Sequence, residues 1–215
     1  MTDFFIPHSD IEHASALGFF VSDPMATDRQ AELQAAMALD NATADETGKL
    51  DAKTRTCLGT LRFATLMRDP MPDVIGAIDT SLLELAVSEP LKTALAPLVE
   101  DAVEFIPVPN MWNKTDNTAW TGAPYYFLNV RLRLDGWDRD KTQIYIHDQQ
   151  PNGETPQSLT GRATVKRAAV GDALIWRDAH TRTLVIAKRI KDLLDQFRTE
   201  ALFYARVATS EPGAD

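Results

Sequence analysis

The clearest helical pattern in the chain begins directly after residue 88. Four apolar residues there have the spacing i, i+3, i+4 and i+7, which places them on one face of a helix. These residues are Leu91, Ala94, Leu95 and Leu98. Ser88 or Glu89 can cap this helix, and Pro90 fits its first turn because the N–H that proline lacks would have no partner there. Pro97 predicts that the helix bends or ends early.

Short apolar runs at residues 82–87 and 103–108 predict a strand before and a strand after this helix. The same pattern returns later, because residues 184–207 align with residues 85–108 without a gap at an offset of 99. The identical pairs are Leu85/Leu184, Lys92/Lys191, Leu95/Leu194, Ala102/Ala201 and Val108/Val207. The chain therefore predicts two similar strand–helix–strand elements.

Between these elements the apolar residues alternate with polar ones. Alternation at residues 128–134 predicts a strand with one buried face, and residues 144–147 alternate in the same way. Residues 173–176 predict a short buried strand, and the polar segment 149–158 predicts a loop. Strands thus occupy most of the chain between the two strand–helix–strand elements.

The N-terminal region has a different character. Strong helix formers after a capping-box spacing predict a helix over residues 28–39, and a second helix is predicted over 52–68. The fold class is therefore α+β, with a mixed sheet, two similar strand–helix–strand elements and a helix-rich N-terminal region. The predicted divisions are a helix-rich region at 1–69, an α+β domain at 70–208 and a disordered tail at 209–215.

Composition and charge narrow the class of protein. The chain has 215 residues, 44% of them hydrophobic, and a formal net charge of −9. This acidity disfavours binding to nucleic acid or anionic lipid and would speed encounter with a basic partner, although it also serves solubility. Neither a signal peptide nor a membrane span is indicated, so we expect a cytoplasmic protein. With Cys57 alone, no disulfide forms within the chain.

Three carboxylates, Asp135, Asp138 and Asp140, follow the strand predicted at 128–134. Oxygen-rich turns can hold Ca²⁺ or Mg²⁺, but Arg139 and Gly136 do not fit the spacing of a calcium loop. A turn that closes a strand pair is the preferred interpretation, and no metal or cofactor is expected.

Acid–base chemistry has two candidate pairs. His147 precedes Asp148, and His180 lies near Asp178, so each could form an oriented pair. Structural histidines explain both pairs more simply. Sequence motifs for a hydrolase nucleophile, a phosphate loop or a dinucleotide site are absent, so no catalytic residue is assigned.

Aromatic residues gather between residues 112 and 137. They are Trp112, Trp120, Tyr125, Tyr126 and Trp137. Tryptophan and tyrosine often dominate protein–protein interfaces. Tyr125 alternates with Phe127 and is assigned to the core, whereas the polar loop around Trp112 and Trp120 favours a surface. We predict partner contact at Trp112, Trp120, Asp135, Trp137, Asp138 and Asp140.

Over residues 70–208 the chain resembles an immunity-protein family of bacterial polymorphic toxin systems, the eleventh class, typified by a myxobacterial member. The resemblance depends on four groups of landmarks in the family's order. They are Val87, Ser88, Leu91, Lys92, Ala94 and Leu95; Val103, Glu104, Phe105, Pro107 and Val108; Tyr125, Asn129, Asp135 and Asp138; and Ile175, Trp176 and Arg177.

The resemblance implies a cytoplasmic antitoxin that binds and neutralises a cognate toxin effector by stoichiometric protein–protein interaction. Such effector–immunity pairs serve interbacterial competition, for example through type VI secretion. Two alternatives stay open: an adaptor or chaperone for a secreted effector, and a small hydrolase that reverses toxin damage. The sequence leaves open the oligomeric state and the chemistry of the toxin.

Overall fold

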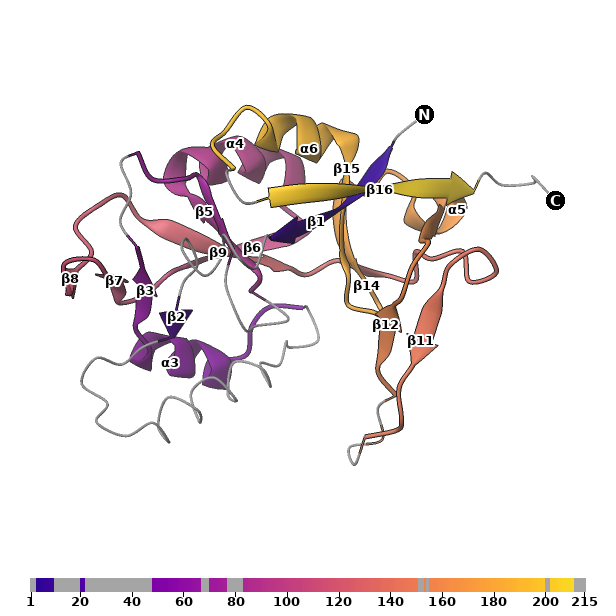
Figure 1. Ribbon diagram of the computed structural model, residues 1–215, viewed down its shortest axis with the longest axis horizontal. Coiled ribbons are helices and arrows are strands. Elements are labelled where there is room, and N and C mark those ends of the chain that lie inside the picture. The colour runs from indigo at the N-terminus through magenta and orange to yellow at the C-terminus, as the bar shows by residue number, and fades with distance from the viewer. Residues whose placement is uncertain are drawn as a thin grey trace. The chain divides into compact units, whose positions relative to one another are not determined.

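The computed structural model describes residues 3–9, 20–21, 48–66, 70–76, 83–150, 153, 155–199 and 202–210 (Figure 1). The chain divides into two compact units. Unit 1 comprises Met1–His8, Leu132–Asp192 and Tyr204–Asp215, and unit 2 comprises Ser9–Arg131 and Leu193–Phe203. Each unit therefore takes in residues from both sides of residue 70.

Unit 2 contains a four-stranded sheet with the order β4-β5-β9-β6. Its strands are β4 (Val74–Gly76), β5 (Leu85–Ser88), β9 (Tyr125–Val130) and β6 (Val103–Pro107). Helix α4 (Glu89–Val99) connects β5 to β6. Of its predicted face, Leu91 and Leu95 are buried and Ala94 and Leu98 are half-buried, and Val99 is buried as well. Ser88 caps the helix as predicted, since its Oγ accepts a hydrogen bond from the backbone N–H of Leu91 at 3.4 Å.

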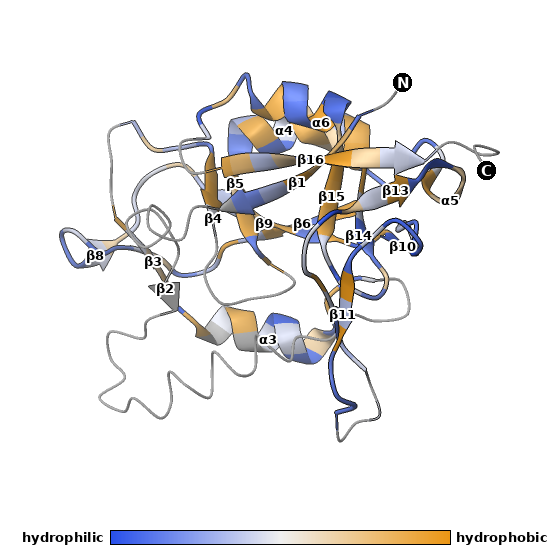
Figure 2. Cartoon of the chain, turned by 45° about the vertical axis from the view of Figure 1, so that its right-hand side comes forward, coloured by the Kyte–Doolittle hydropathy of each residue, from blue (hydrophilic) through white to orange (hydrophobic). Residues whose placement is uncertain are grey.

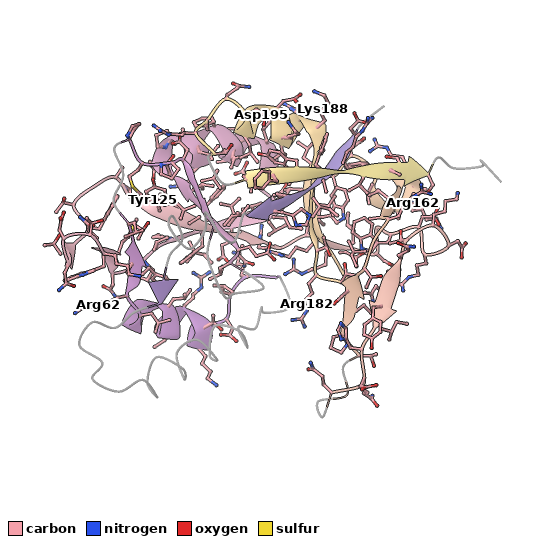
Figure 3. All side chains as sticks on the ribbon, viewed as in Figure 1. Arg62, Tyr125, Arg162, Arg182, Lys188 and Asp195 are labelled. Carbon is pink, nitrogen blue, oxygen red and sulfur yellow. The ribbon has the colours of Figure 1, made fainter. Side chains whose placement is uncertain are left out.

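A second sheet of unit 2 has the order β2-β3-β7-β8. Its strands are β2 (Phe20–Val21), β3 (Phe63–Thr65), β7 (Met111–Asn113) and β8 (Thr118–Ala119). Helix α3 (Ala52–Thr60) precedes β3. The unit's core includes Tyr125 (Figure 3). Its hydroxyl donates a hydrogen bond to the carbonyl of Pro72 at 2.6 Å.

Unit 1 contains a six-stranded mixed sheet with the order β10-β14-β15-β1-β16-β13. Its strands are β10 (Arg133–Leu134), β14 (Ile175–Asp178), β15 (Leu184–Ala187), β1 (Phe4–Ser9), β16 (Leu202–Ser210) and β13 (Thr164–Lys166). The unit also holds the short helix α5 (Arg167–Val170) and the strand pair β11 (Ile144–Ile146) and β12 (Gln157–Leu159). Helix α6 (Lys188–Leu194) connects β15 toward β16.

The strands β5 and β15 are strongly hydrophobic, whereas α4 and α6 are amphipathic (Figure 2).

The two predicted strand–helix–strand elements are confirmed. The first lies in unit 2, and the second lies mostly in unit 1, with Leu193–Phe203 assigned to unit 2. Strands β5 and β15 have equivalent bounds at the offset of 99, and α4 and α6 begin at equivalent residues. In both units another strand lies between the two strands that the helix connects: β9 lies between β5 and β6, and β1 lies between β15 and β16. Both inserted strands run antiparallel to the strand that precedes the helix.

The match between the two elements extends to single side chains. Tyr126 of β9 and Phe5 of β1 lie opposite equivalent residues of β5 and β15. The ammonium of Lys92 lies 3.8 Å from the ring centroid of Tyr126, and that of Lys191 lies 5.7 Å from the ring centroid of Phe5. The identical lysines of the repeat thus each place a cation over an aromatic ring of the inserted strand.

The prediction of a helix-rich N-terminal region is not supported. In the part of residues 1–69 that the structure describes, β1, β2 and β3 accompany one helix, α3. The helix predicted at 28–39 lies outside the described residues. The helix predicted at 52–68 is correct at its start but too long, because Phe63–Thr65 pairs in parallel with β7 as a buried strand.

Other predictions need correction in detail. The alternating segment 128–134 is not one strand with one buried face: β9 ends at Val130, and its last four residues are all buried, so both faces of the strand are covered there. Pro97 does not end α4 early, since the helix continues to Val99. The predicted loop 149–158 is shortened by β12, which begins at Gln157. Among the described helices, none is long and apolar enough to cross a membrane.

Candidate functional site

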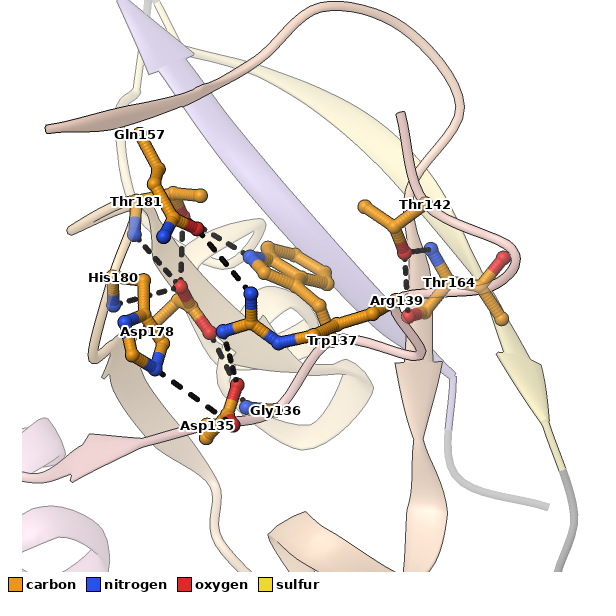
Figure 4. Close-up of polar contacts among 10 residues, drawn as sticks. All are labelled: Asp135, Gly136, Trp137, Arg139, Thr142, Gln157, Thr164, Asp178, His180 and Thr181. Carbon is orange, nitrogen blue, oxygen red and sulfur yellow. Dashed lines mark hydrogen bonds and ion pairs between the residues drawn. The ribbon is translucent and has the colours of Figure 1, made fainter. Parts of the chain in front are cut away.

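The turn after β10 holds the predicted carboxylates and is tied to two strands of unit 1 (Figure 4). The backbone N–H of Asp138 donates to the carbonyl of Thr164 at 2.8 Å, and that of Lys166 donates to the carbonyl of Gly136 at 2.8 Å. The backbone N–H of Gly136 donates to Oδ2 of Asp178 at 3.2 Å. The turn is therefore built into the sheet.

Asp178 is the centre of this arrangement. Its carboxylate is fully buried, and Oδ1 accepts hydrogen bonds from the backbone N–H groups of His180 at 3.1 Å and Thr181 at 2.8 Å and from the Thr181 hydroxyl at 3.0 Å. Together with the bond from Gly136, four donors converge on one carboxylate. Buried charges are found in proteins where such bonds satisfy them, so Asp178 organises the turn at residues 178–183.

Trp137 lies in the core of unit 1, where 3% of its surface is exposed. Its indole N–H donates to the Thr181 hydroxyl at 3.0 Å, which satisfies the polar end of a buried tryptophan. This side chain holds the turn at 135–140 against the turn at 178–183. It presents almost no area to a partner.

The three predicted carboxylates have different surroundings. The side chain of Asp135 is 54% exposed and accepts a hydrogen bond from Arg139 at 3.1 Å, and Asp140 is exposed as well. Asp138 is mostly covered: a hydrogen bond from Ser210 and the nearby ammonium of Lys141 lower the pKa of its carboxyl. Asp135 and Asp140 are thus the two that a partner can reach.

Nothing in this turn resembles a metal centre. Within the described ranges, no group of three or more histidine, cysteine, aspartate or glutamate side chains lies close enough to hold a metal ion. The carboxylate oxygens of Asp178 already accept bonds from protein N–H and O–H groups. The bond from Gly136 to the buried carboxylate of Asp178 holds this turn to the strands of unit 1.

The two candidate acid–base pairs do not form as such. Asp178 contacts the backbone N–H of His180, while the imidazole Nε2 of His180 lies 3.7 Å from Oδ2 of Asp135. His147 contacts Ser158 instead, with 2.8 Å between Nε2 and Oγ, and its ring packs edge-on against Tyr145. Neither arrangement is an imidazole oriented by the neighbouring carboxylate, which was the basis of the hydrolase alternative.

The predicted tryptophans of unit 2 are both half-buried. Trp112 on β7 has the guanidinium of Arg62 4.9 Å from its ring centroid, and its indole N–H donates to Asn117 at 3.1 Å. Trp120 packs against the core of unit 2, and its indole N–H donates to the carbonyl of Ala123 at 2.9 Å. The stacked Arg62 and Trp112 are residue types that favour interfaces.

A second buried polar cluster joins two residues from the family landmarks. Glu104 on β6 lies opposite Asn129 on β9, and Oε2 of Glu104 accepts hydrogen bonds from Nδ2 of Asn129 at 2.9 Å and from the backbone N–H of Leu50 at 3.2 Å. Nδ2 of Asn129 also donates to the carbonyl of Gly48 at 3.0 Å, and Arg55 pairs with the other oxygen of Glu104. These contacts fasten the segment that leads into α3 to the sheet.

The β11–β12 pair carries a surface that the sequence did not reveal. Tyr145 is 57% exposed and Ile146 is 61% exposed, two of the large hydrophobic side chains that lie open in the described part of the chain. Alternation at residues 144–147 predicted the strand, and this is confirmed. It could not predict that a tyrosine and an isoleucine on opposite faces would both be open.

These observations define an α+β protein whose buried carboxylates hold loops in place and whose exposed aromatic and aliphatic side chains offer contact area. The chain belongs to the Immunity protein family (Imm11), whose model matches residues 60–209. The comparison with curated proteins finds no match. The resemblance found in the sequence is therefore confirmed, and the matched range takes in every landmark on which it depended.

Proposed function

We propose that the protein is an immunity protein that binds a cognate toxin domain in the cytoplasm and neutralises it by forming a stoichiometric complex. Membership of the immunity family is the observation that carries this proposal. A protein that inhibits by binding needs contact area rather than a catalytic centre, and the polar clusters around Asp178 and Glu104 have structural roles. In the candidate acid–base pairs, the imidazole of His180 faces Asp135 instead of Asp178, and that of His147 contacts Ser158.

The side chains that support binding are those at least partly open to solvent. In unit 2 they include Trp112 with its stacked Arg62. In unit 1 they include Asp135, Asp140 and the apolar side chains of β11. Among the predicted contact residues we therefore favour Trp112, Asp135 and Asp140, since Trp137 lies in the core.

The experiment is growth of cells that express the candidate toxin domain encoded beside the gene, with and without this protein in the cytoplasm. Rescue of growth, together with co-purification of the two proteins at a fixed ratio, is the expected result. The variant with both His147→Ala and His180→Ala should rescue equally well. Rescue that disappears in this variant, although the variant still binds the toxin, would favour the hydrolase alternative.

The adaptor alternative has a separate readout. An adaptor would bind the toxin without restoring growth, and its deletion would reduce secretion of the effector rather than survival of the cell. Binding without rescue, with expression and toxicity verified, would therefore reject neutralisation.

A further inference from the structure

Within the described residues, the outer edge of β11 presents backbone groups that no other strand pairs with. His147 donates its N–H to the carbonyl of Pro156 at 2.9 Å, and Gln143 accepts a bond from the N–H of Thr160 at 3.0 Å. Since hydrogen-bonded and non-hydrogen-bonded positions alternate along an antiparallel pair, Ile144 and Ile146 occupy the non-hydrogen-bonded positions. Their N–H and C=O groups therefore point away from β12.

The two edges of this pair have different surroundings. Along β12, a polar pocket of about 370 Å³ separates the strand from the turn at residues 179–182. Its lining includes Pro156, Gln157, His180 and Arg182. Among the described strands none pairs with the other edge of β11, which lies on the outside of the hairpin (Figure 1).

The base of the pair is fixed while the rest of β11 is open. Ile144 and Leu159 lie opposite each other, and both pack against the core of unit 1. Two residues further along, Ile146 continues the face of Ile144, while Tyr145 and His147 form an edge-on aromatic contact on the opposite face. An exposed edge with apolar side chains is a template for pairing with another strand.

We infer that the outer edge of β11 receives an extended segment of the toxin as a third strand; this rests on the proposed function. The backbone of that segment would bond the N–H and C=O groups of Ile144 and Ile146, and an apolar side chain of the segment would cover Ile146. The occupant is a strand of a folded partner rather than a second copy. The chain belongs to an immunity family, and the function proposed above requires a surface that binds the toxin, whereas pairing between two copies is an outcome of the second test below.

The first test separates the backbone of residue 146 from its side chain. Ile146→Ala removes the apolar contact and keeps the N–H, whereas Ile146→Pro also removes the outward N–H, which proline tolerates on an edge strand. Binding to the candidate toxin domain is measured for both variants by titration calorimetry. We expect Ile146→Pro to bind about tenfold more weakly than Ile146→Ala, since a carbonyl of the toxin loses its donor.

The second test needs no variant. Amide hydrogen exchange is measured on the free protein and on its complex with the toxin domain. In the free protein the N–H of His147 should be protected and those of Ile144 and Ile146 should not be. In the complex both isoleucine amides should become protected.

Four outcomes would overturn the inference. If wild type binds the toxin and the two isoleucine amides exchange as fast as in the free protein, the toxin binds elsewhere and the proposed function survives alone. If the proline and alanine variants bind the toxin with equal affinity, the outward N–H of residue 146 is not used, and again the proposed function survives alone. If the isoleucine amides are protected in the free protein at high concentration, a second copy occupies the edge. If wild type does not bind the toxin, the proposed function and the inference fail together.

Discussion

Replacing Asp178 by alanine should destabilise unit 1 strongly, although the residue lies in a turn. The substitution removes the acceptor for the backbone N–H groups of Gly136, His180 and Thr181. The Thr181 hydroxyl keeps an alternative, because Thr183 Oγ1 lies 2.9 Å away. Three N–H groups thus lose their partner in a place where the carboxylate itself was fully buried.

The expected cost follows from those three groups. A buried donor left without an acceptor costs about 1–3 kcal/mol, and water reaching the exposed side of the turn at His180 relieves part of this. We therefore expect Asp178→Ala to lower the free energy of unfolding by about 3–5 kcal/mol. Asp178→Asn keeps the oxygen that serves His180 and Thr181 and loses the bond from Gly136, which predicts a cost of about 1–2 kcal/mol.

Urea unfolding followed by tryptophan fluorescence and circular dichroism measures these differences. The matched control is Asp135→Ala, because Asp135 belongs to the same site and is 54% exposed, so its loss should change stability by about 0.5 kcal/mol or less. The reasoning is refuted if Asp178→Ala unfolds within about 1 kcal/mol of wild type, or if Asp135→Ala costs as much as Asp178→Ala.

The same unfolding assay tests the next two predictions, and amide hydrogen exchange tests the third. Burial, assisted by the charge of Asp73, raises the pKa of the Tyr125 hydroxyl, so the stability it contributes is present below about pH 10 and is lost as the pH rises further. Tyr125→Phe should flatten that alkaline loss and cost about 1 kcal/mol at neutral pH. Leu91→Ala and Ile190→Ala, at equivalent positions of the repeat, should each cost about 2–4 kcal/mol. Glu104→Ala should accelerate amide exchange of the segment that leads into α3 before it affects the rest of unit 2.

The parts of the fold that were predictable from sequence depend on local patterns. The face of α4 and its cap at Ser88 follow from spacing within one helix, and the repeat placed a second such helix at α6. The lysines Lys92 and Lys191 were identical in the repeat, but the aromatic partner of Lys92 follows it on β9, whereas that of Lys191 lies near the N-terminus on β1. The sequence pattern predicted the strands and the helix of each strand–helix–strand element. It could not predict which strand would lie between the two strands of each element.

The same limit explains the errors at the candidate site. Trp137 lies among aspartates, glycine and arginine, so its neighbours in sequence indicated a surface. Its hydrogen-bond partner, Thr181, is 44 residues away. His180 lies two residues from Asp178, which suggested an acid–base pair, whereas the carboxylate bonds the backbone of the turn. The role of Trp137 thus depends on a partner that is far away in the sequence, and the role of Asp178 depends on backbone N–H groups.

The charges are distributed unevenly along the chain, so the N-terminal residues and the family-matched range would contribute differently to the binding of a partner. Residues 1–47 contain nine aspartates and glutamates and one arginine, whereas the family-matched residues 60–209 contain nineteen acidic and eighteen basic side chains. Almost all of the formal charge of −9 therefore lies outside the matched range. Attraction to a basic toxin would act on the association rate and depend on salt, and it would come mainly from the N-terminal residues. Strand pairing at β11 belongs to the nearly neutral part of the chain, so the strength of that contact should depend little on salt.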